Sequence, residues 1–496
     1  MKTKVCLVLN APTLRENLAL VDLYRHWIDV VELRVDCLSP DERLQFRGFP
    51  EMAGIPCILT IRRKSDGGQF VEGEGSRTAL LARGLAFADT DPRKNFAYID
   101  LEEDLQVPSI EEAARAFGTR IIRSVHDMEG PIADIADRVR KLRRTKDEIA
   151  KIAFTPKSLA DVTNLFRESK KLAGEDYILI AMGQYGLPSR ILAPIVGSLV
   201  TFVSSEESIK RSGNSLGHLD PISINETYRI RNISESTRIF GVTGNPLVAT
   251  SSPAIHNAGY ARQGIDAVYI PIKAETIEET IEFAEETGIT GLSVTFPFKE
   301  TVLPNLAEIS AETGEIGACN TIVKSEDGWN GFNTDAPGFS RALLEFLGRR
   351  DLKRLKIAII GAGGAAKAIA HAVKALGGKA CVFNRTTDKA RELAQQYNFK
   401  WATLDAGNRL LLENYSDVII QTTNVGMSPD TEADPIDFYS FTGHEAVYDV
   451  IYHPDRTRML KRAQKAECKV CNGYTMLQYQ GYLQYKLFTG VDYAEN

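Results

Sequence analysis

One lysine of this sequence stands in a segment that is otherwise apolar. Lys151 lies in DEIAKIAFTP, residues 147–156, with apolar residues on both sides and a proline after them. A short apolar run closed by proline is typical of a buried strand. Desolvation of a buried amine lowers its pKa, and a neutral amine is a nucleophile that can form an imine with a ketone. The alternative is a lysine whose stem lies along apolar surface while its ammonium reaches water.

Other polar residues occur at the ends of further strand-like runs. Glu32 and Arg34 are two apart in VVELRVD, so they share one face of a strand. Arg62 ends PCILTIR and His126 stands near the end of RIIRSVHD, while Arg190 follows another run in GLPSRI. An amine beside a histidine and arginines suits imine chemistry with an acid/base group and anion-binding groups.

Strand-like runs recur at a steady period over residues 1–204, and helical patterns such as PIADIADRVRKLRR separate most of them. Strands that alternate with helices predict a parallel sheet, and eight such units predict a closed (β/α)8 barrel with its site at the carboxyl ends of the strands. An open sheet or a ninth unit is the alternative. The expected strands are 5–10, 30–36, 56–62, 96–102, 120–127, 149–154, 177–183 and 199–204.

The motifs VELRVD, TIRRKSDGG, SVHDM, KIAFTP and MGQYGLPSRILAPIVGS resemble type I 3-dehydroquinate dehydratases over residues 1–222. The resemblance implies a (β/α)8 barrel in which Lys151 forms a Schiff base with the substrate ketone, without a cofactor. It implies that His126 is the general acid/base and that Arg190 pairs with the substrate carboxylate. The substrate-binding residues that it implies are Glu32, Arg34, Arg62, Asp66, Met182, Arg190, Asn214 and His218.

The sequence departs from that family's pattern at three of these positions. Asp66 stands where a glutamate is usual and is one methylene shorter, while Asn214 and His218 replace the serine and glutamine of a lid. Each replacement still forms hydrogen bonds, so the same roles are expected with altered strength. The alternative interpretation is a degenerate barrel that only binds or regulates.

A second alternation of strands and helices follows the polar stretch 223–235, which is either a linker or a last helix of the barrel. LKIAIIGAGGAAKAIAHAV contains a strand, a GxGxxA turn at Gly361, Gly363 and Ala366, and a helix. Small residues in such a turn let the backbone approach a pyrophosphate at the helix N-terminus. This order of elements predicts a dinucleotide-binding Rossmann domain.

The strand after this turn indicates which dinucleotide is bound. It ends in Asn384, Arg385 and Thr386 instead of in an aspartate or glutamate. An acidic residue there would bind the ribose hydroxyl of NAD, whereas an arginine suits the 2′-phosphate of NADP. The sequence therefore favours NADP, and the alternative is an arginine exposed on a loop.

The motifs GLSVTFPFKE, IGACNTIV, GFNTDAPGF, TTNVGM, YDVIYHP and NGYTMLQYQG surround this domain, and together they resemble shikimate dehydrogenases over residues 236–496. Alone, Lys299 or Asp335 would suit a surface or capping position. The resemblance implies that they are the catalytic pair and that NADPH is the reductant. The substrate-binding residues that it implies are Thr250 (where a serine is usual), Ser252, Thr295, Asn320, Tyr452 and Gln480. The cofactor-binding residues are Gly361, Gly363, Gly364, Ala365, Asn384, Arg385, Thr386, Lys389, Thr423, Asn424, Met427 and Gly473.

The two resemblances imply consecutive reactions. The first is dehydration of 3-dehydroquinate to 3-dehydroshikimate, and the second is NADPH-dependent reduction of that product to shikimate. Quinate is the alternative substrate of the second half. The expected segments are a barrel at 1–222, a linker at 223–235, a substrate-binding α/β domain at 236–340 completed by 472–496, and a Rossmann domain at 341–471.

Composition supports this interpretation. The 496 residues are too many for one core, and 44% hydrophobic with 25% charged residues is typical of a globular protein. The net charge of −6 argues against nucleic acid and membrane partners and leaves small molecules. The seven cysteines include CKVC, which has no second pair or nearby histidine, so we expect free thiols and no metal. Without a recognisable signal, transit or membrane segment, the expected location is the cytoplasm.

Overall fold

The structure is a computed structural model that describes residues 2–86, 89–211, 219–247 and 250–495. The chain forms two compact units, Met1–Ile289 and Thr290–Asn496, and each is described by itself. Within the described residues, every helix is too short or too polar to cross a membrane.

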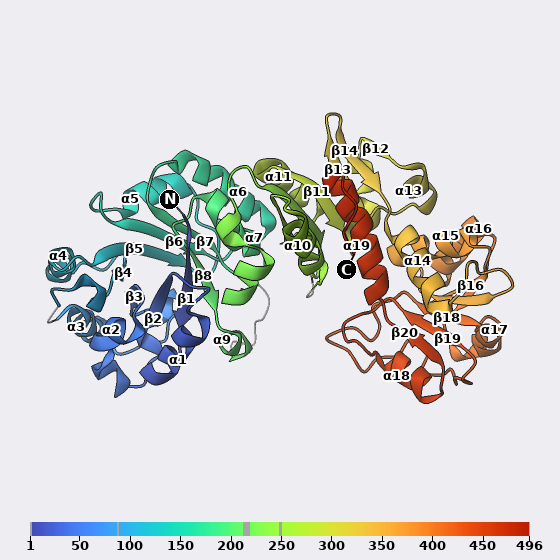
Figure 1. Cartoon of the computed structure of the whole chain (residues 1–496), viewed down its shortest axis with the longest axis horizontal. Coiled ribbons are helices and arrows are strands. Elements are labelled where there is room, and N and C mark those ends of the chain that lie inside the picture. Colours follow the sequence, from blue (N-terminus) through green and yellow to red (C-terminus); the bar gives the residue numbers. More distant parts are fainter. Residues whose placement is uncertain (1, 87–88, 212–218, 248–249, 496) are drawn as a thin grey trace. The chain divides into compact units, whose positions relative to one another are not determined.

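The first unit contains a barrel of parallel strands (Figure 1). In the described part of this unit, eight strands follow the order β7-β6-β5-β4-β3-β2-β1-β8, so eight strands are confirmed and a ninth unit is wrong. The second strand ends earlier than expected because Val35–Cys37 turns into a 3-10 helix. The strands are β1 Lys4–Leu9, β2 Val30–Arg34, β3 Cys57–Thr60, β4 Tyr98–Glu102, β5 Arg120–Asp127, β6 Ile149–Phe154, β7 Tyr177–Ala181 and β8 Val200–Ser204.

The barrel closes where β7 and β8 meet. The backbone N–H of Leu199 donates to the carbonyl oxygen of Tyr177 at 2.9 Å. The Ser198 hydroxyl also spans this seam, because it accepts from the N–H of Leu179 at 3.2 Å and donates to the carbonyl of Val200 at 3.0 Å. The sheet is therefore a nearly closed barrel, and the open-sheet alternative is wrong.

Alternate residues of the strands point into the barrel and form layers. The lowest layer is apolar and includes Cys6, Val30, Ile58, Ile122, Ile149, Ile178 and Val200. Residues two positions further along a strand lie on the same face, one layer higher. From β2 to β6 that next layer is buried and polar, and consists of Glu32, Thr60, Asp100, Ser124 and Lys151. An apolar floor thus supports a polar layer toward the carboxyl ends of the strands.

Helices and short turns connect the strands on the outside of the barrel (Figure 1). The longer ones bury one apolar face against it; α6 begins with a capping box formed by Ser158 and Asp161. The helices are α1 Leu14–Tyr24, α2 Phe49–Ala53, α3 Glu74–Leu85, α4 Pro108–Ala116, α5 Ile135–Leu142, α6 Leu159–Ser169, α7 Leu187–Ile191, α8 Ala193–Val196 and α9 Glu206–Arg211.

The first unit continues beyond the barrel. The polar stretch after residue 222 forms two short helical turns, Ser223–Thr227 and Ile230–Asn232, which bury Ile224 and Ile230. Two parallel strands follow, β9 Arg238–Gly244 and β10 Ala267–Lys273, with the helices α10 Ser252–Gln263 and α11 Ile277–Thr287. The segment boundaries expected from the sequence stay predictions.

The second unit begins with a small sheet in the order β11-β13-β14-β12. Its pairing is antiparallel except between β12 and β14. Two long helices, α14 and α19, pack closely here: a Cβ atom on Gly338 would lie 2.7 Å from the backbone nitrogen of Gln480. The elements are β11 Ile289–Val294, α12 Phe298–Thr301, β12 Glu308–Ile309, α13 Ala311–Ile316, β13 Thr321–Ser325, β14 Gly328–Phe332, α14 Asp335–Leu347 and α19 Tyr474–Thr489.

The second unit also contains a parallel sheet in the order β17-β16-β15-β18-β19-β20, which confirms the Rossmann fold. Along β15, Ile357 and Ile359 join one core cluster while Ala358 and Ile360 join another, so both faces are covered. The elements are β15 Lys356–Ile360, α15 Gly364–Ala375, β16 Lys379–Asn384, α16 Thr387–Tyr397, β17 Lys400–Thr403, α17 Arg409–Glu413, β18 Val418–Gln421, β19 Ala446–Asp449, α18 Arg458–Lys465 and β20 Lys469–Cys471.

Candidate active sites

Lys151 points into the barrel from the middle of β6. Its side chain is only 5% exposed, so the interpretation that its ammonium reaches water is wrong. The Nζ atom donates to Asp100 Oδ2 at 2.9 Å and to Glu32 Oε1 at 3.4 Å. It also lies 4.6 Å from the centroid of the Phe202 ring. The amine is therefore buried, with two carboxylates on one side and an aromatic face on another.

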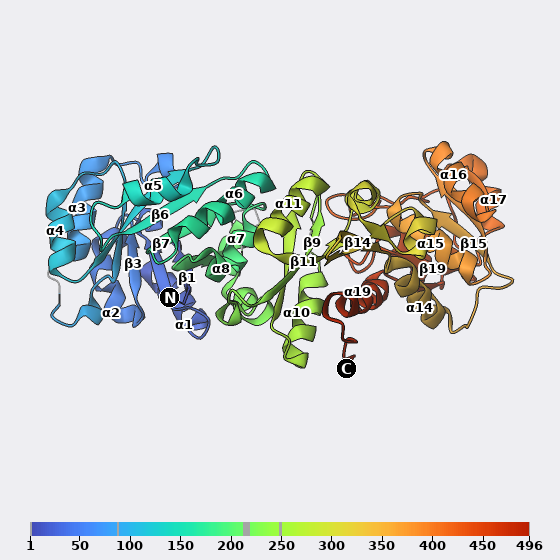
Figure 2. The ribbon, with the colours of Figure 1, turned by 90° about the horizontal axis from the view of Figure 1, so that it is seen from above.

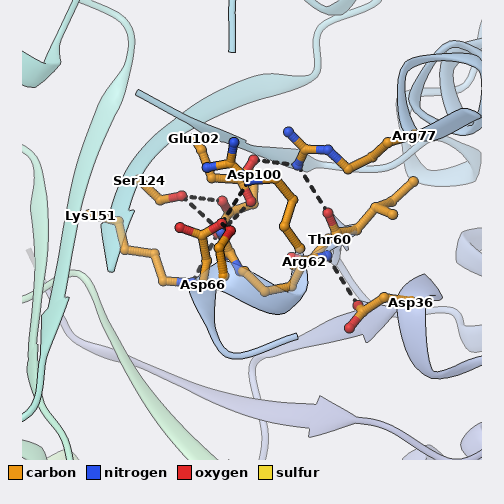
Figure 3. A network of polar contacts seen from close by, with 12 residues as sticks. Asp36, Thr60, Arg62, Asp66, Arg77, Asp100, Glu102, Ser124 and Lys151 are labelled. Atoms are coloured by element: carbon orange, nitrogen blue, oxygen red, sulfur yellow. Dashed lines mark hydrogen bonds and ion pairs between the residues drawn. The ribbon is translucent and has the colours of Figure 1, made fainter. Parts of the chain in front are cut away.

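Arg62 shares Asp100 with Lys151 (Figure 3). Its guanidinium contacts Asp100 Oδ2 at 2.8 Å and Glu102 Oε1 at 2.7 Å, and it donates to the Ser124 hydroxyl at 3.1 Å. Arg77 of α3 reaches the other oxygen of Glu102. Arg62 and Lys151 thus converge on Asp100, and we call Glu32, Arg62, Asp100, Glu102 and Lys151 the barrel cluster.

These charges change the protonation of their neighbours. Burial raises the pKa of Asp100, but Arg62 and Lys151 outweigh burial and keep that pKa well below its usual range. Burial, followed by Arg62 and Lys151, holds the pKa of His126 well below its usual value. Among the described residues, His126 Nδ1 has no hydrogen-bond partner. A neutral imidazole next to the lysine can therefore accept a proton at neutral pH.

Two further predicted residues are arginines near the carboxyl ends of strands. Two nitrogens of the Arg34 guanidinium donate to the two carboxylate oxygens of Asp36, at 3.0 and 2.8 Å. Asp36 also accepts the backbone N–H of Arg62 at 3.2 Å. Arg190 lies on α7, and burial lowers its pKa to about 10. A desolvated guanidinium binds an anion strongly because little water competes. Met182 packs against the apolar floor of the barrel.

The remaining predicted barrel residues are placed differently. Asp66 accepts from Arg63 at 2.7 Å and from the Ser65 hydroxyl at 3.0 Å, outside the barrel cluster. Asn214 and His218 lie outside the described residues.

Sequence reasoning missed Asp100 and Glu102, although they are the carboxylates that Arg62 contacts. They stand two apart in YIDLE, the same spacing that placed Glu32 and Arg34 on one strand face. That spacing on an expected strand was the available signal.

In the second unit, Lys299 and Asp335 form an ion pair. Lys299 Nζ lies 2.6 Å from Asp335 Oδ2, with side chains 17% and 7% exposed. Asp335 is the first residue of α14, and its other oxygen accepts from Asn320 Nδ2 at 2.8 Å. The Asn333 side chain accepts the N–H groups of Asp335 and Ala336 at 3.0 and 3.2 Å. A carboxylate at a helix N-terminus is electrostatically favourable, so Lys299 and the start of α14 both hold Asp335 in place.

Amides surround this ion pair. Asn320 Nδ2 lies 3.3 Å from Gln480 Oε1 on α19. One turn later on α19, Gln484 donates to the carbonyl of Asn320 at 3.1 Å and accepts from the Ser293 hydroxyl at 2.8 Å. The sequence reasoning missed Gln484; its position four residues after Gln480, on the same helical face, was the signal. We call Asn320, Asp335, Lys299, Gln480 and Gln484 the amide cluster.

Four other predicted substrate residues lie on loops or at the start of a helix. Thr250 and Ser252 belong to the first unit, and their hydroxyl oxygens are 3.2 Å apart at the start of α10. Thr295 accepts the N–H of Phe298 at 2.8 Å and so shapes the turn before α12. Tyr452 follows β19 and is half-buried.

The glycine turn after β15 has the geometry that a dinucleotide needs. Gly361 has φ +116°, and a Cβ atom there would lie 2.4 Å from Thr422 Oγ1. Gly363 is the N-cap of α15, whose first residue is Gly364. A Cβ atom on Gly364 would lie 3.2 Å from Cδ of Lys299, so the lysine stem rests on the beginning of this helix. The amide cluster and the glycine turn are therefore neighbours.

The other expected cofactor residues follow β16 and β18. Arg385, Thr386 and Lys389 are exposed, and the Asn384 amide donates to the carbonyl of Thr386 at 2.9 Å. After β18, the buried Gln421 side chain bonds the backbone of the loop that carries the predicted residues Thr423, Asn424 and Met427. Gly473 precedes α19, where a Cβ atom would lie 1.9 Å from the carbonyl oxygen of Val450. Ala365 lies in the first turn of α15.

Three segments of the chain match models of known protein families. Residues 5–235 match the family model of type I 3-dehydroquinase. Residues 242–322 match that of the shikimate dehydrogenase substrate binding domain, and residues 344–428 match shikimate / quinate 5-dehydrogenase.

The chain is also similar to individual known proteins. The bifunctional 3-dehydroquinate dehydratase/shikimate dehydrogenase, chloroplastic, of Arabidopsis thaliana is 29% identical over 93% of this chain and 78% of its own length. The NADP(+) shikimate dehydrogenase of Halothermothrix orenii is 39% identical over 52% of this chain and 92% of its own. The solved structure of shikimate 5-dehydrogenase from Thermus thermophilus with NADP(H) and shikimate covers 52% of this chain and 95% of its own, at 32% identity and TM-score 0.46.

Proposed function

Because the chain belongs to the family of bifunctional 3-dehydroquinate dehydratase/shikimate dehydrogenases, we propose that the barrel cluster and the amide cluster are its two active sites. The first half dehydrates 3-dehydroquinate to 3-dehydroshikimate without a cofactor. The second half reduces that product to shikimate with NADPH. Its substrates are thus small molecules.

In the barrel, Lys151 attacks the substrate ketone, a C–N bond forms and the carbonyl oxygen leaves as water. The neutral imidazole of His126 removes a proton from the carbon next to the imine, and the hydroxyl on the following carbon leaves as water after protonation. Hydrolysis of the imine then returns the amine of Lys151. The observation that carries this assignment is the burial of Lys151 beside a histidine whose pKa lies well below its usual value.

The remaining barrel residues bind the substrate in this proposal. Arg190 pairs with the substrate carboxylate, while Arg34, Arg62 and Glu32 contact the substrate hydroxyl groups. Asp66 contacts the substrate near the open end of the barrel. The imine is positively charged when protonated, and the carboxylates of Asp100 and Glu32 stabilise that charge.

In the second half, NADPH supplies the hydride when it is bound. Lys299 donates a proton, or holds a positive charge, at the oxygen of the carbonyl that becomes a hydroxyl. Asp335 orients the lysine at 2.6 Å, while Asn320 and Gln480 offer amides to the substrate. The remaining contacts to substrate are proposed for Thr250, Ser252, Thr295 and Tyr452.

The residues present fit NADP. A turn that tolerates only glycine at Gly361 leaves room for the pyrophosphate at the start of α15. Arg385 and Lys389 are exposed cations after β16, suited to the 2′-phosphate. Thr423, Asn424, Met427 and Gly473 are proposed to line the nicotinamide.

We also propose a reducing compartment such as the cytoplasm, because all seven cysteines are free thiols. The relative from Arabidopsis is named as chloroplastic, so direct localisation of the protein is the measurement that decides. We propose no nucleic acid partner, because the net charge is −6.

Borohydride trapping tests the barrel assignment. Borohydride added during turnover with 3-dehydroquinate should reduce the imine and leave substrate-derived mass on the peptide that contains Lys151. Mass on another lysine, or none, would contradict the assignment. Assaying the Lys151→Met variant, which should not dehydrate, with 3-dehydroshikimate and with 3-dehydroquinate, each with NADPH, tests whether the second half prefers shikimate or quinate as its product.

A further inference from the structure

The loop after β7 contains Met182 and leads into α7, which carries Arg190; the tip of this loop contacts residues outside the barrel. The Tyr185 hydroxyl at this tip donates to the carboxylate of Glu275. The ammonium of Lys273 lies over the ring of Tyr185, 4.4 Å from its centroid. Lys273 ends β10 and Glu275 precedes α11, so both contacts come from the dehydrogenase half of the chain.

The barrel holds the two ends of this loop. A Cβ atom on Gly186 would lie 2.0 Å from the carbonyl oxygen of Ala181, so the loop folds back tightly onto the end of β7. The Ser189 hydroxyl donates to the carbonyl of Gly186 at 2.8 Å, and Thr201 donates to the carbonyl of Arg190 at 2.9 Å. These bonds fix the backbone on either side of the tip, whereas Tyr185 is held by Lys273 and Glu275.

Glu275 also contacts a second loop. Its other carboxylate oxygen accepts from the side-chain amide of Asn245 at 3.0 Å. Asn245 directly follows β9 and stands five residues before Thr250 in the sequence. One carboxylate is therefore shared by Tyr185, which precedes the helix that carries Arg190, and by Asn245, which precedes two proposed substrate residues of the dehydrogenase in the sequence.

We propose that Tyr185, Lys273 and Glu275 form a clamp through which the dehydrogenase half positions the substrate-binding loop of the dehydratase. The clamp restricts the loop tip before substrate arrives, so less conformational entropy is lost when Arg190 binds the substrate carboxylate. Tyr185, Lys273 and Glu275 are positioning residues, because they act through Arg190. This inference rests on the proposed role of Arg190.

The same two parts of the first unit also meet away from the loop, which provides a matched control. Helix α6 of the barrel lies beside α11 (Figure 2), and Phe166 packs edge-on against Phe283 with ring centroids 5.4 Å apart. Arg167 forms ion pairs with Glu282 and Glu286, each at 3.1 Å. Arg167 therefore joins the two parts without contacting the loop after β7.

Steady-state kinetics of both reactions on the full chain test the clamp. Tyr185→Phe should raise the KM for 3-dehydroquinate roughly fivefold to tenfold, with a smaller change in kcat, because it removes one hydrogen bond to a charged group. It should leave the KM for 3-dehydroshikimate unchanged. Glu275→Gln should raise both KM values, since Glu275 also holds Asn245.

Arg167→Met is the control and should leave both KM values unchanged. The clamp is wrong if Tyr185→Phe leaves the KM for 3-dehydroquinate unchanged, or if Arg167→Met raises it equally. Arg190→Met, measured in parallel, tests the proposed role of Arg190 separately from the clamp. If that variant binds 3-dehydroquinate normally, the proposed role of Arg190 is overturned, and with it the reason for the clamp.

Discussion

The two proposed active sites hold their lysines in different surroundings. Lys151 lies in a layer that also contains the carboxylates Glu32 and Asp100, and Asp100 contacts both Lys151 and Arg62. Lys299 has one ionic partner among the described residues, Asp335, and amides surround that pair. The barrel side chains come from β2, β4 and β6 and from the residues that follow β3, whereas those of the second site come from helices and a loop.

This difference matches the chemistry that each lysine must perform. A lysine that becomes a protonated imine keeps a positive charge through much of the reaction, so fixed carboxylates around it stabilise each intermediate. A lysine that serves a forming hydroxyl needs one orienting carboxylate and must remain free to approach the substrate oxygen. A strand framework suits the first requirement, because register fixes every charge in a layer.

The largest expected effect comes from removing the imine lysine. Lys151→Met should lower kcat of the dehydratase by about 10⁴-fold or more, because no other amine of the barrel cluster can form the imine. NADPH-dependent reduction of 3-dehydroshikimate by the same preparation should stay at the wild-type rate. Residual dehydration within tenfold of wild type would show that Lys151 is not the nucleophile.

The second lysine should matter by a smaller factor. Lys299→Met should lower kcat for reduction of 3-dehydroshikimate by about 10²–10⁴-fold, the range for a general acid, while dehydration is unchanged. Supplied 3-dehydroquinate should then accumulate as 3-dehydroshikimate. The control is Lys367→Met, which removes a more exposed lysine paired with Glu300 at 2.7 Å. Equal losses in both variants would contradict a proton-donating role for Lys299.

The cofactor prediction separates binding from catalysis. Arg385→Asp should raise the KM for NADPH by about tenfold to hundredfold, because it replaces the proposed phosphate partner with a repelling carboxylate. The KM for NADH should change little. If the two cofactors are weakened to the same extent, Arg385 does not contact the 2′-phosphate.

Overpacking between α14 and α19 should impair the dehydrogenase site and leave the dehydratase site unchanged. Gly338→Ala places a Cβ atom 2.7 Å from the backbone of Gln480, so α14 and α19 must separate at a cost of about 1–3 kcal/mol. Thermal unfolding and the reduction assay should both show the loss, while dehydration continues. Gly75→Ala in α3 is the control, since no atom lies within 4 Å of its Cβ position. A harmless Gly338→Ala would mean that the two helices have room to spare.

The smallest expected effect is on the pH dependence of dehydration in the barrel. Since His126 has a pKa well below its usual value, it stays neutral near neutral pH, and kcat/KM for dehydration should be flat between about pH 6 and pH 8. With an ordinary histidine pKa of about 6.5, the rate at about pH 6 would be roughly fourfold lower. Such an acid limb in the pH profile would contradict His126 as a base with a lowered pKa. In the unfolded chain His126 takes up a proton below about pH 6.5, whereas in the fold it does not, so it lowers stability as pH falls.

The sequence by itself determined the elements and the candidate reacting groups. The period of the apolar runs predicted the eight strands, and Lys151 stood out because an apolar strand rarely carries an amine. The turn at Gly361 was equally readable, since a strand, a glycine turn and a helix follow one another within a few residues. These features are local, so the physical cause lies within the segment itself.

Only the tertiary structure decided which groups meet. Asp100 lies 51 residues from Lys151 along the chain, and its role depends on the strand order and register that bring β4 and β6 into one layer. Gln484 joins the amide cluster because α19 packs against α14 at the position where Gly338 leaves space. Such contacts form because distant segments of the chain are buried and packed closely together. The sequence pattern of either segment alone does not reveal them.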